Sequence, residues 1–241
     1  FNILIVDKNY YFLFFSLFWT PICQGQLLLQ KNYFDEQNRR IESIISISVN
    51  DSTLEGPYLA YYPNGHKKIE GFYHLNHADS LWSYYHDNNY KKAVGYFMNN
   101  KQHGLWQYYD SSGIKQREVT FNNGLKSGIY KDYYSEEKIK SSGELLNSKK
   151  VGLWKEYNQE GLLNNTKWIQ NDTVVVQRYF YSNGNIKRQG TKINRVSSGQ
   201  WTFFFENGQV ASEGFFKDDK LEGTWVYWNE NGVKKAEGNY T

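Results

Sequence analysis

The chain has 241 residues, with 28 Lys and Arg against 25 Asp and Glu, for a formal charge of +3. This near balance excludes the basic footprint of a nucleic-acid-binding protein. Cys23 is alone, which excludes an internal disulfide framework and a cysteine metal cluster. Aromatic residues make up 18 % of the chain, and only 3 residues are proline, a composition that favours β-strands.

Residues 1–25 predict a signal peptide. Lys8 is followed by an apolar run over residues 10–19 and by the small residue Gly25, after which we expect cleavage. The run is short for a membrane span, although a buried first strand and a membrane anchor remain alternatives. Ile22 precedes Cys23 and is not small, so we do not expect lipidation. The protein is therefore expected to be exported, to the periplasm, the cell envelope or the medium.

Residues 26–55 predict an N-terminal cap. The segment "NYFDEQNRRIESIISISVNDSTLE", from about Asn32, is a degenerate copy of a repeat that is clearer further along the chain. The chain also begins without methionine and stops in mid-pattern at "GNYT". We therefore expect that the protein continues beyond both ends of this sequence.

Residues 56–241 contain eight repeats, of which the last is truncated. The segments "GLWQYYDSSG", "GQWTFFFENG" and "GTWVYWNENG" are copies of one another, and a fixed period indicates a repeat architecture. The period is 24 residues, with a single step of 23. The first residues of the repeats, which define position 1, are Gly56, Ser80, Gly104, Gly128, Gly152, Val175, Gly199 and Gly223.

Each repeat predicts a β-hairpin. Positions 9 and 10 are Asn-Gly in the clearest repeats, for example Asn64-Gly65, and Asn-Gly between aromatic runs indicates a two-residue turn with positive φ at both residues. Such a turn places positions whose numbers sum to nineteen opposite one another. The fold class is therefore expected to be all-β, an elongated, single-layer, twisted antiparallel sheet of tandem hairpins.

This register places large rings opposite glycines. Position 3 faces position 16, which pairs Trp201 with Gly214 and Trp225 with Gly238. We expect each ring to lie over the bare backbone of the glycine that it faces. Three residues break the pattern: Val119 and Lys167 occupy position 16, and Gln177 occupies position 3.

Position 6 is aromatic in every repeat and, by strand alternation, points away from the ring at position 3. Its expected cross-strand partner, position 13, is lysine in five repeats, and a lysine beside a ring gains about 0.5–1 kcal/mol at exposed sites. These side chains form the candidate binding face. They are Tyr61, Tyr85, Tyr109, Tyr133, Tyr157, Phe180, Phe204 and Trp228, with Lys68, Lys92, Lys140, Lys187 and Lys235.

The pattern G-x-W-x-Y-Y-x-x-N-G, followed by a charged strand and E-G, resembles the MORN repeat in its bacterial variant form. "GTWVYWNENGVKKAEGNYT" and "NGQVASEGFFKDDKLEGTW" carry the likeness, which extends over about residues 56–241. The resemblance implies successive antiparallel hairpins with roles in scaffolding, protein contacts or phospholipid binding. Bacterial relatives are often described as antitoxin-like, a role that fits an exported chain poorly.

No motif predicts catalysis, a metal or a cofactor. His74, His77 and His86 lie close in sequence, but later repeats do not reproduce them, so solvated histidines are expected. Glutamates recur at position 15, at Glu70, Glu118, Glu213 and Glu237, where they are expected to balance nearby lysines. We therefore predict a non-enzymatic, exported scaffold that binds an unidentified protein. Binding of an envelope glycan or an anionic phospholipid through the aromatic–lysine face is the alternative.

Overall fold

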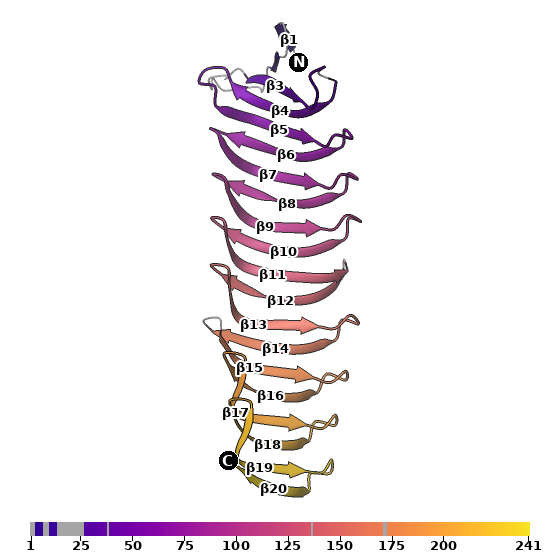
Figure 1. Cartoon of the computed structure of the whole chain (residues 1–241), viewed down its shortest axis with the longest axis vertical. Coiled ribbons are helices and arrows are strands. Elements are labelled where there is room, and N and C mark those ends of the chain that lie inside the picture. Colours follow the sequence, from indigo (N-terminus) through magenta and orange to yellow (C-terminus); the bar gives the residue numbers. More distant parts are fainter. Residues whose placement is uncertain (1–2, 7–9, 14–26, 38, 136, 171–172) are drawn as a thin grey trace, which may run out of the picture. The chain divides into compact units, whose positions relative to one another are not determined.

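The computed structural model describes residues 3–6, 10–13, 27–37, 39–135, 137–170 and 173–241, and all of its regular structure is β-strand (Figure 1). The strands form two compact units. The first comprises residues 1–116 and 120–125, and the second comprises residues 117–119 and 126–241. Within the described residues no helix is long and apolar enough to cross a membrane. The predicted cleavage point after Gly25 lies outside the described residues, so the signal peptide remains a prediction.

The first unit contains ten strands, the last of which it shares with the second unit. They are β1 (Ile3–Val6), β2 (Tyr10–Leu13), β3 (Leu27–Tyr33), β4 (Ile41–Ser48), β5 (Leu54–Tyr61), β6 (Lys67–His74), β7 (His77–Tyr85), β8 (Lys91–Met98), β9 (Lys101–Tyr109) and β10 (Lys115–Asn122). Of β10, residues 117–119 belong to the second unit.

The second unit contains the remaining strands. They are β11 (Leu125–Ser135), β12 (Lys138–Leu146), β13 (Lys149–Tyr157), β14 (Leu163–Gln170), β15 (Thr173–Phe180), β16 (Ile186–Ile193), β17 (Val196–Phe204), β18 (Val210–Lys217), β19 (Lys220–Trp228) and β20 (Lys234–Tyr240). Leu125, the first residue of β11, is counted with the first unit.

Each predicted repeat is one antiparallel hairpin, and the predicted register of its body is confirmed. In the first unit Tyr58 pairs with Gly71, and in the second Trp201 pairs with Gly214 and Trp225 with Gly238. Consecutive hairpins continue the same antiparallel pairing, as between β6 and β7. The predicted fold class, all-β with tandem hairpins in a single antiparallel layer, is therefore confirmed within each unit.

The predicted two-residue turn is wrong in the hairpins that carry Asn-Gly. Tyr62 N donates to His66 O and Gly65 N donates to Tyr62 O, at 2.8 and 2.9 Å, which encloses three residues. Only the glycine has positive φ, +87° at Gly65. The loop is therefore a turn followed by a glycine bulge. It shifts the register at its base by one residue, so that Tyr61 pairs with Lys67 and not with Lys68.

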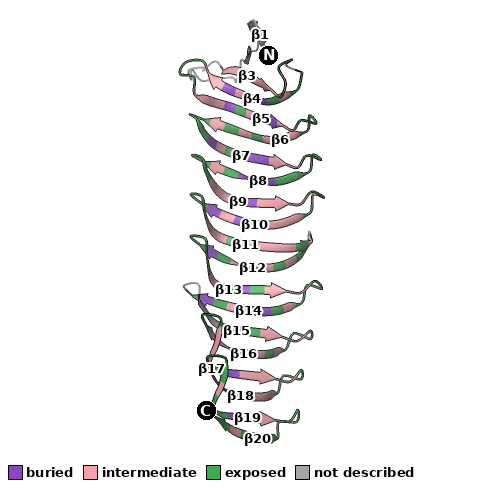
Figure 2. Cartoon of the chain, viewed as in Figure 1, coloured by how far each residue is buried: buried purple, intermediate pink, exposed green. Residues whose placement is uncertain are grey.

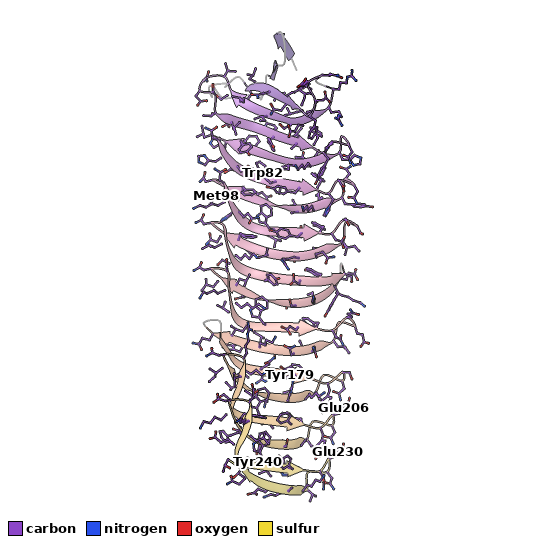
Figure 3. All side chains as sticks on the ribbon, viewed as in Figure 1. Trp82, Met98, Tyr179, Glu206, Glu230 and Tyr240 are labelled. Atoms are coloured by element: carbon purple, nitrogen blue, oxygen red, sulfur yellow. The ribbon has the colours of Figure 1, made fainter. Side chains whose placement is uncertain are left out.

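The asparagine at position 9 has a different role from the predicted one. Asn64 Oδ1 accepts from His66 N within its own turn, and Nδ2 donates to Asp87 O of the next hairpin at 2.9 Å. The same bond to the next turn recurs from Asn183 to Glu206 O and from Asn207 to Glu230 O. Glu206 and Glu230 lie at the hairpin turns (Figure 3). The asparagines therefore connect successive turns.

Two-residue turns with positive φ lie instead between repeats. Asn99 and Asn100 have φ of 51° and 64°, and they join the paired residues Met98 and Lys101. Asp218 and Asp219 form the equivalent turn in the second unit, with φ of 51° and 63°. The sequence signal missed these turns because Asn and Asp tolerate left-handed backbone without an adjacent glycine.

The expectation that a ring covers the glycine of its own hairpin is also wrong. The indole over Gly214 is that of Trp225, in the following hairpin, and a Cβ added to this glycine would overlap the ring. Trp225 Nε1 donates to Phe215 O, the carbonyl next to the glycine, at 3.0 Å. The same ring-over-glycine contact joins Gly71 to Trp82, Gly95 to Trp106, Gly143 to Trp154 and Gly190 to Trp201, although Trp82 Nε1 donates to Asp79 O of its own strand. Each tryptophan therefore binds its hairpin to the one before it.

This contact explains the residues that broke the predicted pattern. Where position 16 is not glycine, position 3 of the next repeat is not tryptophan: Val119 precedes Tyr130, and Lys167 precedes Gln177. A side chain at position 16 occupies the space that an indole would need. Position 16 and the following position 3 therefore vary together along the chain.

Buried residues form only short segments of the strands, most of which are intermediate or exposed (Figure 2). The five tryptophans that cover a glycine are between 1 % and 4 % exposed, although each unit has only one layer. A single sheet has no second layer to bury its side chains. Here, the apolar burial comes from rings packed along the sheet, from one hairpin to the next.

Candidate binding surfaces

The sheet in each unit presents two faces. The tryptophan face carries positions 3, 5, 14, 16 and 18, which in the first unit include Trp106 and Tyr108 of β9 with Ala93 and Phe97 of β8. The reverse face carries positions 2, 4, 6, 15 and 17, which include Leu81, Glu70 and Phe72. Strand alternation separates the two sets.

The tryptophan face carries arrays of packed rings in both units. In the first unit Tyr84 lies 6.4 Å from Trp82 and 6.1 Å from Trp106, centroid to centroid, and Phe97 meets Trp106 edge-on at 5.1 Å. In the second unit, Phe216 meets Trp225 in the same way. Edge-to-face and offset contacts are favourable geometries for aromatic pairs.

The position-6 rings are half-buried, and the structure does not pair them with the position-13 lysines. Tyr85 Oη donates to Glu70 Oε2 at 3.1 Å, and Tyr133 Oη donates to Glu118 Oε2 at 2.8 Å. Both glutamates belong to the preceding hairpin. On the reverse face these two rings therefore contact carboxylates and not the predicted lysines. Burial first, and then the bond to Glu118, raises the pKa of Tyr133.

The position-13 lysines are exposed, and three of them lie near the ring at position 7 instead. Lys68 Nζ lies 5.7 Å from the centroid of Tyr62, and Lys140 and Lys187 make the same contact with Tyr134 and Tyr181. For Lys68 the cause is the glycine bulge, which shifts the register at the base of its hairpin. The predicted set of rings and lysines is therefore divided between two surfaces.

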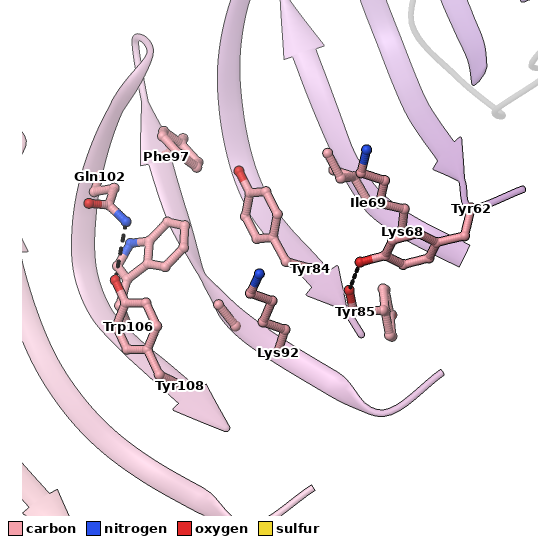
Figure 4. A pocket seen from close by; sticks show the side chains of 11 residues that line it. Tyr62, Lys68, Ile69, Tyr84, Tyr85, Lys92, Phe97, Gln102, Trp106 and Tyr108 are labelled. Carbon is pink, nitrogen blue, oxygen red and sulfur yellow. Dashed lines mark hydrogen bonds between the residues drawn. The ribbon is translucent and has the colours of Figure 1, made fainter. Parts of the chain in front are cut away.

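A groove of about 300 Å³ opens on the tryptophan face of the first unit (Figure 4). Tyr62, Tyr84 and Tyr108 line it above Trp106, and its other lining residues are Lys68, Ile69, Tyr85, Lys92, Ala93, Phe97 and Gln102. Tyr62 Oη donates to the backbone carbonyl of Tyr85 at 2.8 Å, which holds this wall of the groove in place. Lys68, Lys92 and Tyr85 are the members of the predicted face that meet here.

A second groove, of about 630 Å³, lies on the reverse face of the same unit. Its lining includes Leu59, Phe72 and Leu81, with Tyr85 and Lys91 at one end. Exposed apolar side chains continue from it along the hairpins at positions 2 and 17. These residues, which we call the apolar stripe, are Phe72, Leu81, Tyr96 and Leu105 in the first unit and Ile129, Leu153, Trp168, Val176 and Phe215 in the second.

Polar side chains interrupt the ring array in the second unit. Lys167 Nζ lies 2.6 Å from Glu156 Oε1, and Asn165 Nδ2 donates to Glu156 Oε2 at 2.8 Å. Burial acts to raise the pKa of Glu156, but the bonds from Lys167 and Asn165 outweigh it and hold this pKa below its ordinary value. A similar cluster joins Arg117 to Asp132 at 2.7 Å. The sequence signal for both clusters was a carboxylate at position 5, where five other repeats carry a ring and the first carries Ala60.

The histidines do not converge. His74 Nδ1 contacts Glu55, His77 Nδ1 contacts the carbonyl of Leu75, and His86 Nε2 contacts the carbonyl of Tyr109. Among the residues that the structure describes, no three His, Cys, Asp or Glu side chains are placed to hold a metal ion. Three of the position-15 glutamates meet lysines, as predicted: Glu70 with Lys67, Glu118 with Lys131 and Glu237 with Lys234.

Tyr84 gives the first unit a measurable dependence on alkaline pH. Burial raises the pKa of Tyr84 from 10.0 to about 12. Because the pKa of Tyr84 is higher in the folded state than in the unfolded state, its neutral phenol contributes fully to the free energy of unfolding below pH 10. This contribution is lost as the pH rises toward 12. We expect Tyr84→Phe to flatten the fall in the free energy of unfolding over this window, measured by urea unfolding at a series of pH values. Tyr96→Phe, at an exposed tyrosine, is the matched control, and equal slopes in both variants would contradict the expectation.

Comparison with known proteins supports the repeat assignment. Five segments match the family model described as MORN repeat variant: residues 54–74, 102–123, 174–191, 198–218 and 221–241. MORN repeats are in general non-catalytic modules that contact proteins or membrane lipids. A search of curated proteins found no match.

Among solved structures, a chain of "Crystal Structure of TcdB2-TccC3-Cdc42" is similar over 96 % of this chain, at 10 % identity and a TM-score of 0.22. The match covers 17 % of that chain, so this chain spans less than a fifth of its length.

Proposed function

We propose that this chain, five of whose segments match the MORN repeat variant, is a non-enzymatic exported scaffold that binds a protein. The observation that carries the proposal is the apolar stripe. Leu81, Tyr96 and Trp168 are 47 %, 54 % and 52 % exposed, and each occupies position 2 or position 17, which face each other within a hairpin. Single exposed apolar residues are ordinary, whereas a contiguous exposed patch is typical of a protein interface.

The surroundings of the stripe have the composition of an interface. The reverse-face groove adds Leu59 and the half-buried ring of Tyr85 to the stripe, and Glu70 and Lys91 lie at its border. An apolar centre with a polar rim is the usual anatomy of a protein contact. We therefore place the partner on the reverse face, with the position-6 rings beside the stripe.

The proposal also includes export through residues 1–25. Its support is the sequence pattern of Lys8, the apolar run at 10–19 and Gly25. N-terminal sequencing of the exported protein should begin at Gln26. An antitoxin-like role, by resemblance to bacterial relatives, would instead require a toxin that reaches the same compartment.

The test is affinity capture by the mature chain from an envelope extract of its own organism, followed by binding measurements with each purified protein. We expect Leu81→Glu with Leu105→Glu, both in the first unit, to weaken binding of the partner by about tenfold or more, because two charges would then be buried at the contact. Val49→Glu with Leu125→Glu is the matched control, since these residues are exposed to a similar extent in the same unit but lie outside the stripe. The control should bind normally.

A second candidate function is the binding of an envelope glycan or an anionic phospholipid. The observation that favours it is the exposure of all five position-13 lysines. Enrichment of lipid or polysaccharide without a protein in the same capture would replace the protein-binding proposal with this one. Lipid attraction through lysines should also weaken steeply as the salt concentration rises.

A further inference from the structure

Neighbouring lysines at positions 12 and 13 have different electrostatic partners in the β5–β6 and β19–β20 hairpins. At position 12, Lys67 lies 3.0 Å from Glu70, and Lys234 forms the equivalent pair with Glu237. At position 13, no lysine forms an ion pair within the described part of the chain. The reverse-face carboxylates therefore neutralise Lys67 and Lys234 and leave the position-13 lysines available to an external anion.

The tryptophan-face groove lies between two of these lysines. Lys68 and Lys92 occupy equivalent positions two strands apart, which corresponds to about 10 Å along the sheet. No carboxylate is among the groove's lining residues, and most of them are aromatic or aliphatic. The groove therefore favours a ligand that combines an apolar group with negative charge on both sides of it.

The ring contacts argue against a sugar as that ligand. A sugar ring stacks on a free aromatic face, but Lys68 lies over Tyr62, and Tyr62 Oη already donates to the Tyr85 carbonyl. Trp106, beneath the groove, is 2 % exposed. At about 300 Å³ the groove lies at the lower limit of small-molecule pockets, which suits a single side chain.

We propose that the groove binds an acidic, extended peptide segment of a protein partner. The segment places one apolar side chain between Tyr62, Tyr84 and Tyr108, and its carboxylates meet Lys68 and Lys92. An extended chain advances about 3.3 Å per residue, so acidic residues three positions apart match the separation of the lysines. The inference rests on the proposed function in one respect, that the partner is a protein; its site is separate from the apolar stripe.

The test uses the full chain and a fluorescein-labelled peptide, Ser-Glu-Ser-Phe-Glu-Ser, whose glutamates lie three positions apart, with binding followed by fluorescence anisotropy. Lys68→Glu with Lys92→Glu is expected to weaken binding by about tenfold or more. Lys101→Glu with Lys220→Glu changes the charge equally at exposed lysines outside the groove and should bind as the unmodified chain does. Replacing the peptide's Phe by Ser should also weaken binding, which a purely electrostatic attraction would not show.

Three outcomes would overturn the inference. The first is equal binding by the two charge-reversal variants. The others are binding of a polyuronate, or of phosphatidylglycerol vesicles, in place of the peptide. The variant Leu81→Glu with Leu105→Glu separates the two proposals: it should bind this peptide normally while losing the partner at the stripe. If only the peptide test fails, the proposed function still stands. If only the test of the apolar stripe fails, the proposal of a peptide-binding groove still stands.

Discussion

Gly214→Ala is expected to lower the free energy of unfolding by about 3 kcal/mol, the upper end of the usual cost of overpacking. The added Cβ would overlap the indole of Trp225 in the next hairpin, and the rigid sheet leaves the ring little room to move. Trp225→Ala should cost about 3–5 kcal/mol through loss of a large buried ring. Both values are measurable by urea unfolding followed through the remaining tryptophans.

A double-mutant cycle distinguishes the observed packing from the arrangement expected from the sequence. Gly214 pairs with Trp201 in its own hairpin, but Trp225 is the ring that covers it. Once Trp225 is alanine, Gly214→Ala should cost little, which gives a coupling energy of at least about 1.5 kcal/mol. The matched cycle with Trp201 should show a much smaller coupling. A larger coupling to Trp201 would contradict packing between successive hairpins.

Gln177→Trp is expected to destabilise the second unit by about 2–3 kcal/mol, because the Lys167 side chain occupies the space over position 16. Combining it with Lys167→Gly recreates the Gly-Trp pair found between other hairpins and should recover most of that loss. Lys167→Gly alone removes the contact with Glu156 and should also destabilise. Urea unfolding of the single and double variants measures the coupling.

The other irregular contact supplies the control for this exchange. Val119 and Tyr130 occupy the same positions between an earlier pair of repeats. Val119→Gly with Tyr130→Trp should show a coupling of the same sign, although Tyr130→Trp also removes a hydrogen bond to Asp132. If the changes in the free energy of unfolding were additive within each pair of substitutions, position 16 would not determine which ring the next hairpin can carry.

Much of the fold could be predicted from local sequence. The 24-residue period, alternating rings and turn residues were sufficient for the number of hairpins and for pairs such as Trp225 with Gly238. Turn types were less predictable. Asn-Gly suits both a two-residue turn and a three-residue loop with a glycine bulge, and Asn64 adopts its conformation through bonds to its own turn and to the next one.

The candidate site was less predictable, because a one-residue shift in register changes the partners of a side chain. The bulge removes Lys68 from Tyr61 and leaves it near Tyr62, in the groove on the tryptophan face. The apolar stripe was also missed, since Leu81 and Tyr96 belong to a pattern weaker than the aromatic one. Its signal was a large apolar residue recurring at position 2, immediately after the first glycine.

By itself, the sequence determined that this protein is a series of β-hairpins, since strand period, ring spacing and turn chemistry act over a few residues. Only the tertiary structure decided which ring covers which glycine, and which lysines keep a free charge. These contacts join residues of different hairpins. Trp225 and Gly214, for example, meet because the next strand lies beside them, and a pattern read within one repeat contains no information about its neighbour.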